Sequence, residues 1–187
     1  MEPELEPELS ECRWQIEAIR RDATRLLDGM SEDELTWREN GATWSIADCL
    51  NHLAVTGNQS LPRICEAISD GRSRGLLGRG PFRHGFLGNC LIRLMDAPPA
   101  VKFKVPAPYR PAPDLSVSEI VAGFYLLQHD LIEALKGADG IDLSRARVTN
   151  PVTRWLTMSL GQEFAFTAAH ERRHLWQASQ IKRKLHA

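Results

Sequence analysis

The stretch TMSLGQEFAFTAAHERRHLWQASQIKRKL, residues 157–185, decides the fold of this chain. Its apolar and small residues recur every three or four positions, which is the period of a helix buried along one face. The buried seam consists of Leu160, Phe164, Thr167, Ala178, Ile181 and Leu185. His170 and His174 fall on the same seam, where a plain bundle would carry leucine. We therefore expect one long helix from about Thr157 to Leu185 with two imidazoles on its inward face.

Three earlier segments show the same helical period. The first starts at Leu9 and stops before an Asp-Gly pair. The second begins at Ser45 and the third at Ser116, each followed three residues later by an acid, as in a capping box. Residues 31–37 add a short helical turn with the same signature. Four long amphipathic helices with little strand signal predict an all-α four-helix bundle that forms a single domain over residues 1–187.

Residues 69–115 differ in composition and form a long crossover connection between the second and third helices. The Gly/Arg-rich part, DGRSRGLLGRG, predicts loop, and FLGNCLIRLM predicts one short helix. The stretch APPAVKFKVPAPYRPAP predicts extended, polyproline-like chain, in which KFKV (102–105) alone has strand character. Such a length is unusual in a compact bundle, so we expect the connection to cross the bundle and to form a wall of a substrate groove. Its arginine-rich start could meet an anionic ligand.

Charge and composition exclude several classes of protein. The 23 Lys and Arg nearly balance the 24 Asp and Glu, whereas a dedicated nucleic-acid binder carries a strong basic surplus. The opening MEPELEPELS is acidic and proline-bearing, unlike a signal or transit peptide, and no apolar run approaches the roughly 20 residues that span a bilayer. The 4 cysteines are scattered, without a CxxC pair. We expect a cytoplasmic protein with reduced thiols that binds neither nucleic acid nor membrane.

The pair His170 and His174 is the sharpest chemical signal in the chain. Because a helix advances by about 100° per residue, these two residues lie one turn apart on one face. Buried imidazoles need partners, and neutral imidazole nitrogen is a good ligand for zinc, nickel or copper. The pair therefore indicates either a metal site or two hydrogen-bonded histidines at a helix edge.

Residues 170–174, HERRH, also match the HExxH motif of zinc metalloproteases, in which Glu171 would be the general base. Such enzymes usually take their third ligand from downstream. His186 is the only histidine in residues 175–187, and no Glu or Asp occurs there. Glu171 also points about 80° away from the midpoint of the two histidines. These observations disfavour a protease.

His52, on the second helix, is an upstream candidate for a third ligand. Helical geometry places it about 140° from the centre of that helix's apolar stripe, on the same side as Asp48, Thr56 and Gln59. It is therefore either a solvated surface histidine or a ligand in an open groove near the edge of the bundle. An open groove is what a catalytic metal site with a free coordination position requires.

The arrangement of these motifs resembles the DinB-like superfamily. The residues that carry the resemblance are Trp37-Arg38, Trp44-Ser45, Asp48, His52-Leu53, His170, His174-Leu175 and Gln177. The resemblance covers nearly the whole chain, including the long connection with its KFKVPAP segment. It implies a four-helix bundle with a metal on three histidines, which correspond here to His52, His170 and His174.

The same resemblance implies a function. The family includes thiol S-transferases and isomerases that use low-molecular-weight thiols, so we expect a metal-dependent enzyme that transfers a thiol to a small electrophile. Three histidines leave coordination positions open for water or a thiolate, so hydrolysis is the alternative reaction. A non-catalytic bundle that binds metal or a protein partner is the alternative class. The expected metal is zinc or nickel, and the expected partners are a small-molecule substrate, with a low-molecular-weight thiol first, and a second copy in a homodimer.

Other polar residues are weaker candidates. His129 falls opposite the apolar stripe of the third helix, which predicts a surface residue, and His84 lies in a loop that could close over a site. Glu163, two turns before His170, is predicted as a rim carboxylate paired with an arginine rather than a second-shell partner or an extra ligand. Gln177 could orient a bound water. A local positive patch, for which a solvated loop is the simpler interpretation, consists of Arg72, Arg74, Arg79 and Arg83.

Overall fold

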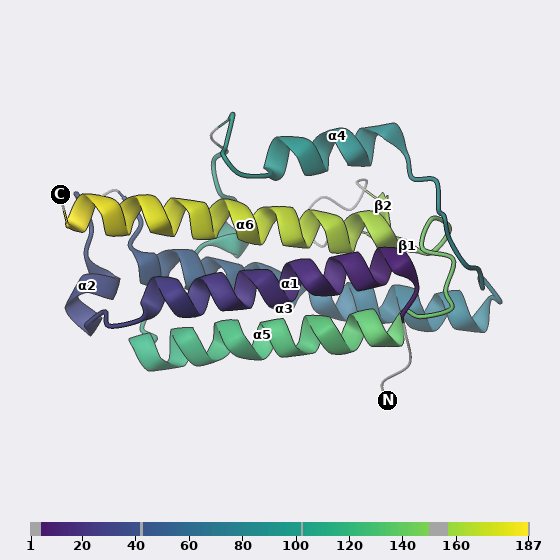
Figure 1. The fold of residues 1–187 in the computed structure, drawn as a ribbon, viewed down its shortest axis with the longest axis horizontal. Coiled ribbons are helices and arrows are strands. Elements are labelled where there is room, and N and C mark those ends of the chain that lie inside the picture. The colour runs from purple at the N-terminus through teal and green to yellow at the C-terminus, as the bar shows by residue number, and fades with distance from the viewer. Residues whose placement is uncertain (1–4, 42, 102, 150–156, 187) are drawn as a thin grey trace.

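Four long helices form the body of the protein in a computed structural model that describes residues 5–41, 43–101, 103–149 and 157–186. The helices are α1 (Pro7–Leu27), α3 (Ile46–Ser73), α5 (Val117–Gly137) and α6 (Leu160–Leu185). The short elements are α2 (Glu32–Thr36), α4 (Phe86–Met95), the 3-10 turn η1 (Ala107–Tyr109), β1 (Arg147–Thr149) and β2 (Thr157–Ser159). The predicted all-α four-helix bundle is confirmed (Figure 1). None of the described helices has an apolar stretch long enough to cross a lipid bilayer.

The direction of the helices explains the long connection. Around the bundle the order is α1, α5, α3 and α6, which packs against α1 again. The neighbours α3 and α5 run in the same direction, and α1 and α6 run the opposite way (Figure 1). Two parallel neighbours cannot be joined by a short turn, because the chain must return to the end where it started. The connection therefore runs back along the bundle, with α4 lying on α6.

Serine capping boxes set the starts of α3, α5 and α6. The Ser45 hydroxyl accepts a hydrogen bond from the Asp48 backbone N–H at 3.0 Å, and the Asp48 carboxylate accepts one from the Ser45 N–H at 2.8 Å. Ser116 and Ser159 form the same reciprocal pairs with the third residue of their helices. The capping boxes predicted at residues 31, 45 and 116 are confirmed.

The start of the last helix differs from its prediction. The helix begins at Leu160, because Thr157–Ser159 form a strand that pairs antiparallel with Arg147–Thr149. Ser159 ends this strand and caps the helix. The two paired segments are separated in the sequence by residues 150–156, and the helical period of residues 157–185 does not indicate this pairing.

Two predictions about the connection were also wrong. α3 continues to Ser73, into the Gly/Arg-rich stretch expected to be loop, and its buried Gly71 faces Ile141, to which an added β-carbon would lie at 3.3 Å. The segment KFKV forms no strand over Phe103–Val105, while Lys102 lies outside the described residues. The Phe103 ring instead lies under a side chain of α6. The predicted short helix of the connection is confirmed as α4.

The packing of α3 against α5 is closest at Gly57. A β-carbon at this position would overlap the side chain of Leu127, which is fully buried on α5. A side chain at position 57 would therefore force the buried Leu127 side chain to move, in a core that is otherwise closely packed.

We expect Gly57→Ala to lower the free energy of unfolding by about 1–3 kcal/mol, because the added methyl group overpacks this contact. Urea denaturation measures the change. Gly137→Ala is the control, since a β-carbon there meets nothing within 4 Å and alanine is the better helix former. A Gly57→Ala variant as stable as Gly137→Ala would show that the contact is looser than the structure indicates.

Candidate metal centre

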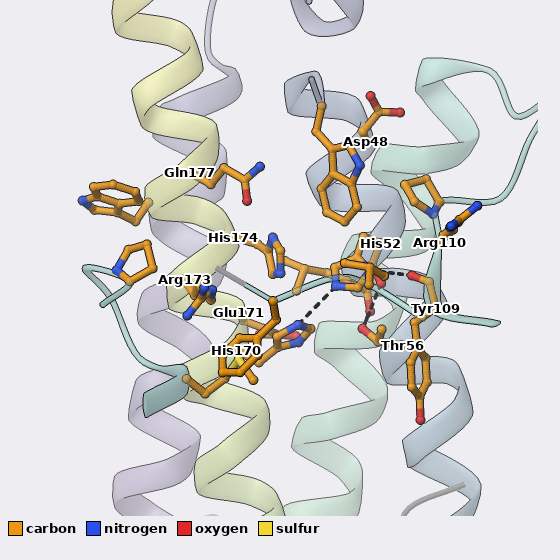
Figure 2. A pocket seen from close by; sticks show the side chains of 18 of the residues that line it. Asp48, His52, Thr56, Tyr109, Arg110, His170, Glu171, Arg173, His174 and Gln177 are labelled. Carbon is orange, nitrogen blue, oxygen red and sulfur yellow. Dashed lines mark hydrogen bonds between the residues drawn. The ribbon is translucent and has the colours of Figure 1, made fainter. Parts of the chain in front are cut away.

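The seam between α3 and α6 holds a pocket of about 1320 Å³ (Figure 2). The two helices form its floor, and residues from Met95 to Pro111 of the connection form one wall. The connection thus lines this groove, as expected. Its arginine-rich start does not, since the pocket lining among the described residues includes none of the four arginines of that patch.

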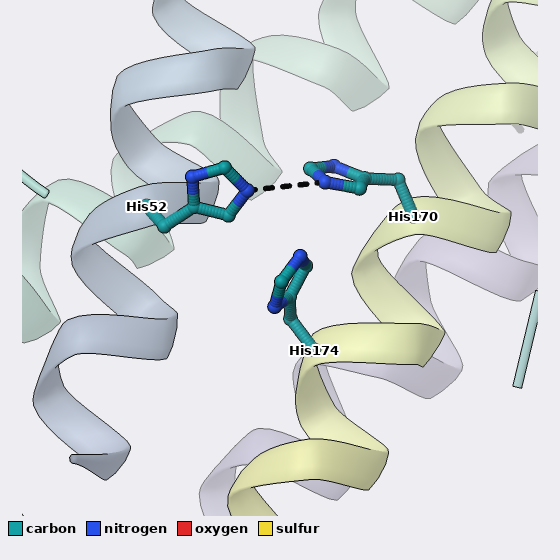
Figure 3. A group of neighbouring side chains, drawn as sticks. All are labelled: His52, His170 and His174. Carbon is teal, nitrogen blue, oxygen red and sulfur yellow. Dashed lines mark hydrogen bonds between the residues drawn. The ribbon is translucent and has the colours of Figure 1, made fainter. Parts of the chain in front are cut away.

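Three histidines from the two helices meet in this pocket (Figure 3). His52 lies in the second turn of α3, and His170 and His174 lie on successive turns of α6. One ring nitrogen from each residue lies within 4.8 Å of the others. The Nε2 atoms of His52 and His170 are 3.2 Å apart. The structure therefore brings together the three residues that the sequence singled out.

Residues next to the histidines hold the two helices in position. Leu53 and Leu175, which follow His52 and His174, are buried in the main core. Trp44, just before α3, lies against two of the three rings, with centroid distances of 4.9 Å to His52 and 5.6 Å to His174. This contact explains why the sequence motif includes Trp44, because its indole covers His52 and His174 on one side.

The connection holds His52 from another side. Nδ1 of His52 lies 2.5 Å from the carbonyl oxygen of Tyr109. A carbonyl oxygen only accepts hydrogen bonds, so Nδ1 carries the proton and Nε2 presents its lone pair toward His170. A backbone carbonyl that orients a histidine in this way is typical of metal sites.

Two polar side chains of α3 fasten the same part of the connection. Asn51 donates to the Ala112 carbonyl at 2.8 Å and accepts from the Ala112 N–H at 3.1 Å. Gln59 donates to the Pro108 carbonyl at 2.6 Å. The prolines of this stretch lack N–H groups, so its carbonyl groups bond to side chains rather than to a neighbouring strand.

Burial keeps the three imidazoles neutral. Burial, together with the proximity of the other rings and of Arg173, lowers the pKa of His170 to about 3 and that of His174 to about 2. Burial also lowers the pKa of His52, against the opposing effect of its hydrogen bond to Tyr109. Neutral imidazole is the form that binds metal ions.

The cluster fits a divalent transition metal. Nδ1 of His174 is buried and has no hydrogen-bond partner among the described residues. Such an atom is costly unless something else satisfies it or its ring. Three neutral nitrogen donors suit zinc, nickel or copper. Within the described part of the chain, no Cys, Asp or Glu joins the group, so a bound ion would keep positions open toward the pocket.

A comparison with models of protein families shows which family the chain belongs to. The model of the DinB superfamily matches residues 15–178, a range that contains all three histidines. The chain belongs to the DinB superfamily. The resemblance seen in the sequence motifs is thereby confirmed. Comparison with curated proteins and with solved structures gives no match.

In this DinB domain, His52 is more buried than its position on the helical wheel of α3 suggests. Helical geometry places it off the apolar stripe, at an exposed edge, yet only 3% of its surface is exposed. Trp44, α6 and the Tyr109 segment cover it. The alternative of a solvated surface histidine is therefore wrong.

Glu163 is not a rim carboxylate paired with an arginine, so that prediction is wrong. Its side chain is buried and lines the pocket. Burial raises its pKa to about 7, and the side chain of Ser60 only partly offsets this effect. Glu163 lies two turns before His170 and does not belong to the three-histidine group.

Glu171 is turned into the protein interior. It is fully buried, and its Oε1 accepts a hydrogen bond from Gln128 of α5 at 2.9 Å. Burial raises its pKa to about 7. This bond across the core agrees with the direction predicted for Glu171, and it disfavours the general-base role that the HExxH motif assigns.

The remaining candidates divide into pocket and distant residues. Gln177 lines the pocket on the turn after His174. His129 is exposed on α5, as predicted. His84 interacts with Ser159 at 2.8 Å and with Glu8 at 2.7 Å, and it is not among the residues that line the pocket.

Two features of the site carried no readable signal in the sequence. The Tyr109 carbonyl is a backbone group, so no residue type reveals it. Arg173 also lines the pocket and is buried, although arginine beside a metal-binding motif usually indicates a solvated helix face. Its burial depends on the packing of α4 against α6, which the residue pattern of the helix does not reveal.

We expect His52→Ala, His170→Ala and His174→Ala each to lose metal binding, because each removes one of three neutral donors. His129→Ala, on the exposed face of α5, should keep it. Metal content is measured on protein purified without a His tag. Zinc should raise the melting temperature of the wild type, since a ligand bound only by the folded state stabilises it. Equal metal content in all four variants would contradict the assignment.

Glu163 should make the DinB domain less stable as the pH rises. Its folded-state pKa, about 7, exceeds the ordinary value of 4.5, so its contribution to stability is complete below pH 4.5 and is lost as the pH rises through 7. Glu163→Gln should therefore be more stable than the wild type at pH 8, by up to about 3 kcal/mol, with a smaller difference at pH 5. Urea denaturation at both values checks this, with the exposed Glu133→Gln as control. An identical difference at both values would contradict the burial of an ionisable Glu163.

Proposed function

We propose that this DinB-superfamily protein is a metal-dependent enzyme that transfers a low-molecular-weight thiol to a small electrophile. One observation carries the proposal: three buried, neutral histidines lie together in a pocket large enough for two small substrates. A purely structural metal site is normally closed by four protein ligands, whereas this cluster offers three within the described residues. The choice of a thiol follows from the family resemblance of the sequence motifs.

The residues of the pocket divide the work of such a reaction. A zinc or nickel ion on the histidines would lower the pKa of a bound thiol, so that it reacts as the thiolate at neutral pH. Tyr109 and Trp44 fix the orientation of His52 and His174. The Glu163 carboxylate, whose pKa lies near 7, can accept the proton that the thiol releases.

The transfer itself balances without a further reactant. The sulfur electron pair forms a bond to the electrophilic carbon, and the bond to the leaving group breaks with its electrons. The connection forms one wall of the pocket in which both substrates would meet.

The test uses untagged protein loaded with zinc or nickel, cysteine as the thiol and 1-chloro-2,4-dinitrobenzene as the electrophile. We expect adduct formation above the uncatalysed rate, lost on chelation and in His170→Ala and retained in His129→Ala. Metal-dependent ester hydrolysis without any thiol would favour the hydrolase instead. Metal binding without either activity, across a panel of thiols and electrophiles, would favour a non-catalytic metal-binding module.

A further inference from the structure

A buried guanidinium group lies beside the three histidines. Arg173 is 8% exposed and lines the pocket (Figure 2). Arg173 directly precedes His174 on α6, and its side chain lies near His170 and His174 in Figure 2. A buried charge is costly unless an opposite charge or several hydrogen bonds offset it.

Arg173 has carbonyl and aromatic partners but no acidic one. It donates to the Val101 carbonyl and, at 3.4 Å, to the Leu94 carbonyl. Its guanidinium carbon lies 5.3 Å from the centroid of the Phe103 ring. Within the described ranges of the chain, no carboxylate forms an ion pair with it. These partners offset part of the desolvation cost and leave the charge uncompensated.

The neighbouring Arg172 shows the contrast. It is more exposed than Arg173, and it forms a two-pronged ion pair with Asp96, with distances of 2.9 and 2.7 Å. A third bond, of 2.7 Å, goes to Gln15. Of these two adjacent arginines, Arg173 is the buried one in the pocket, and it is also the one that forms no ion pair with a described carboxylate.

The rest of the pocket does not supply the missing negative charge. Two of its acidic residues form ion pairs with other cations, Asp48 with Arg38 and Glu39 with Lys184. The other two, Glu171 and Glu163, are buried beside the neutral side chains of Gln128 and Ser60 and form no ion pair with Arg173 or any other described residue. Lys104 and Arg110 also line the pocket, are exposed and form no ion pair with any described residue. Among the described residues that line the pocket, five cationic side chains face four carboxylates. The pocket therefore has an excess of positive charge, which a divalent ion on neutral histidines would increase.

We propose that Arg173 binds an anionic group of the substrate, so that the pocket selects small molecules that carry a carboxylate. A guanidinium group has five N–H donors, and the two carbonyl contacts leave donors free for a carboxylate. Lys104 and Arg110 attract the anion toward the pocket. The inference rests on the proposed function, because it assumes that the reaction takes place at the three histidines. The carboxylate then belongs either to the thiol or to the electrophile.

Two pairs of probes distinguish these sources by titration calorimetry on the zinc-loaded protein. The first pair is 3-mercaptopropionate and 3-mercapto-1-propanol, and the second, without sulfur, is benzoate and benzyl alcohol. We expect the carboxylate of at least one pair to bind at least tenfold more tightly than its neutral analogue. A preference in the first pair alone places the anion on the thiol, and a preference in the second pair alone places it on the electrophile.

Variants of the two adjacent arginines connect this preference to Arg173. Arg173→Gln should abolish the preference, Arg173→Lys should retain part of it, and Arg172→Gln should leave it unchanged. Thermal unfolding checks that each variant is folded. If Arg173→Gln does not fold, the reduced preference of Arg173→Lys tests the proposal instead. A full preference in Arg173→Gln, or none in the wild type for either pair, would overturn the proposal. Thiol transfer without any carboxylate preference would overturn the anion site alone, whereas an Arg173-dependent benzoate preference would support it even where no thiol reacts.

Discussion

The parallel direction of α3 and α5 is the constraint on which the rest of this structure depends. Neighbouring helices that run the same way need a connection about as long as the bundle, so the chain must return outside the four helices. Here the returning chain lies on α6 and then crosses to α3, where Asn51, His52 and Gln59 bond to its backbone. The crossing covers the seam between α3 and α6, and this seam holds the pocket.

The same crossing explains the unusual composition of α6. A helix at the corner of a simple four-helix bundle exposes about half of its surface, whereas α6 contacts α1, α3 and α4. Polar residues on several of its sides are therefore buried, including Glu163, Glu171, Arg173 and His174. Leucine at these positions would stabilise the core more. The buried polar residues therefore indicate a functional site that lowers the stability of the fold.

The sequence predicted the features that depend on local signals. It missed the features that depend on which distant segment packs over a residue. The serine caps and the three-to-four periodicity identified the long helices, and the one-turn spacing of His170 and His174 identified two of the three histidines of the cluster. His52 needed the family resemblance, because its place off the apolar stripe pointed equally well to the surface. The burial of His52 was not predictable from the local sequence, since it depends on the segment around Tyr109, 57 residues away in the chain. The strand at Thr157–Ser159 was missed because its partner, Arg147–Thr149, is a separate segment of the chain, and the local pattern of residues 157–159 does not reveal the pairing.

The donor set and the charge of the pocket are two parts of one electrostatic arrangement. Carboxylate or thiolate ligands would neutralise a divalent ion, whereas three imidazoles leave its full charge in the pocket. Arg173 adds a buried charge of the same sign close to these rings. Positive charge in a site of low polarity stabilises anions more than it does in water, and a thiolate and a carboxylate are both anions. The property that would lower a thiol pKa at this centre is therefore also the one that would favour an anionic substrate, and both follow from a pocket in which cations outnumber the carboxylates available to pair with them.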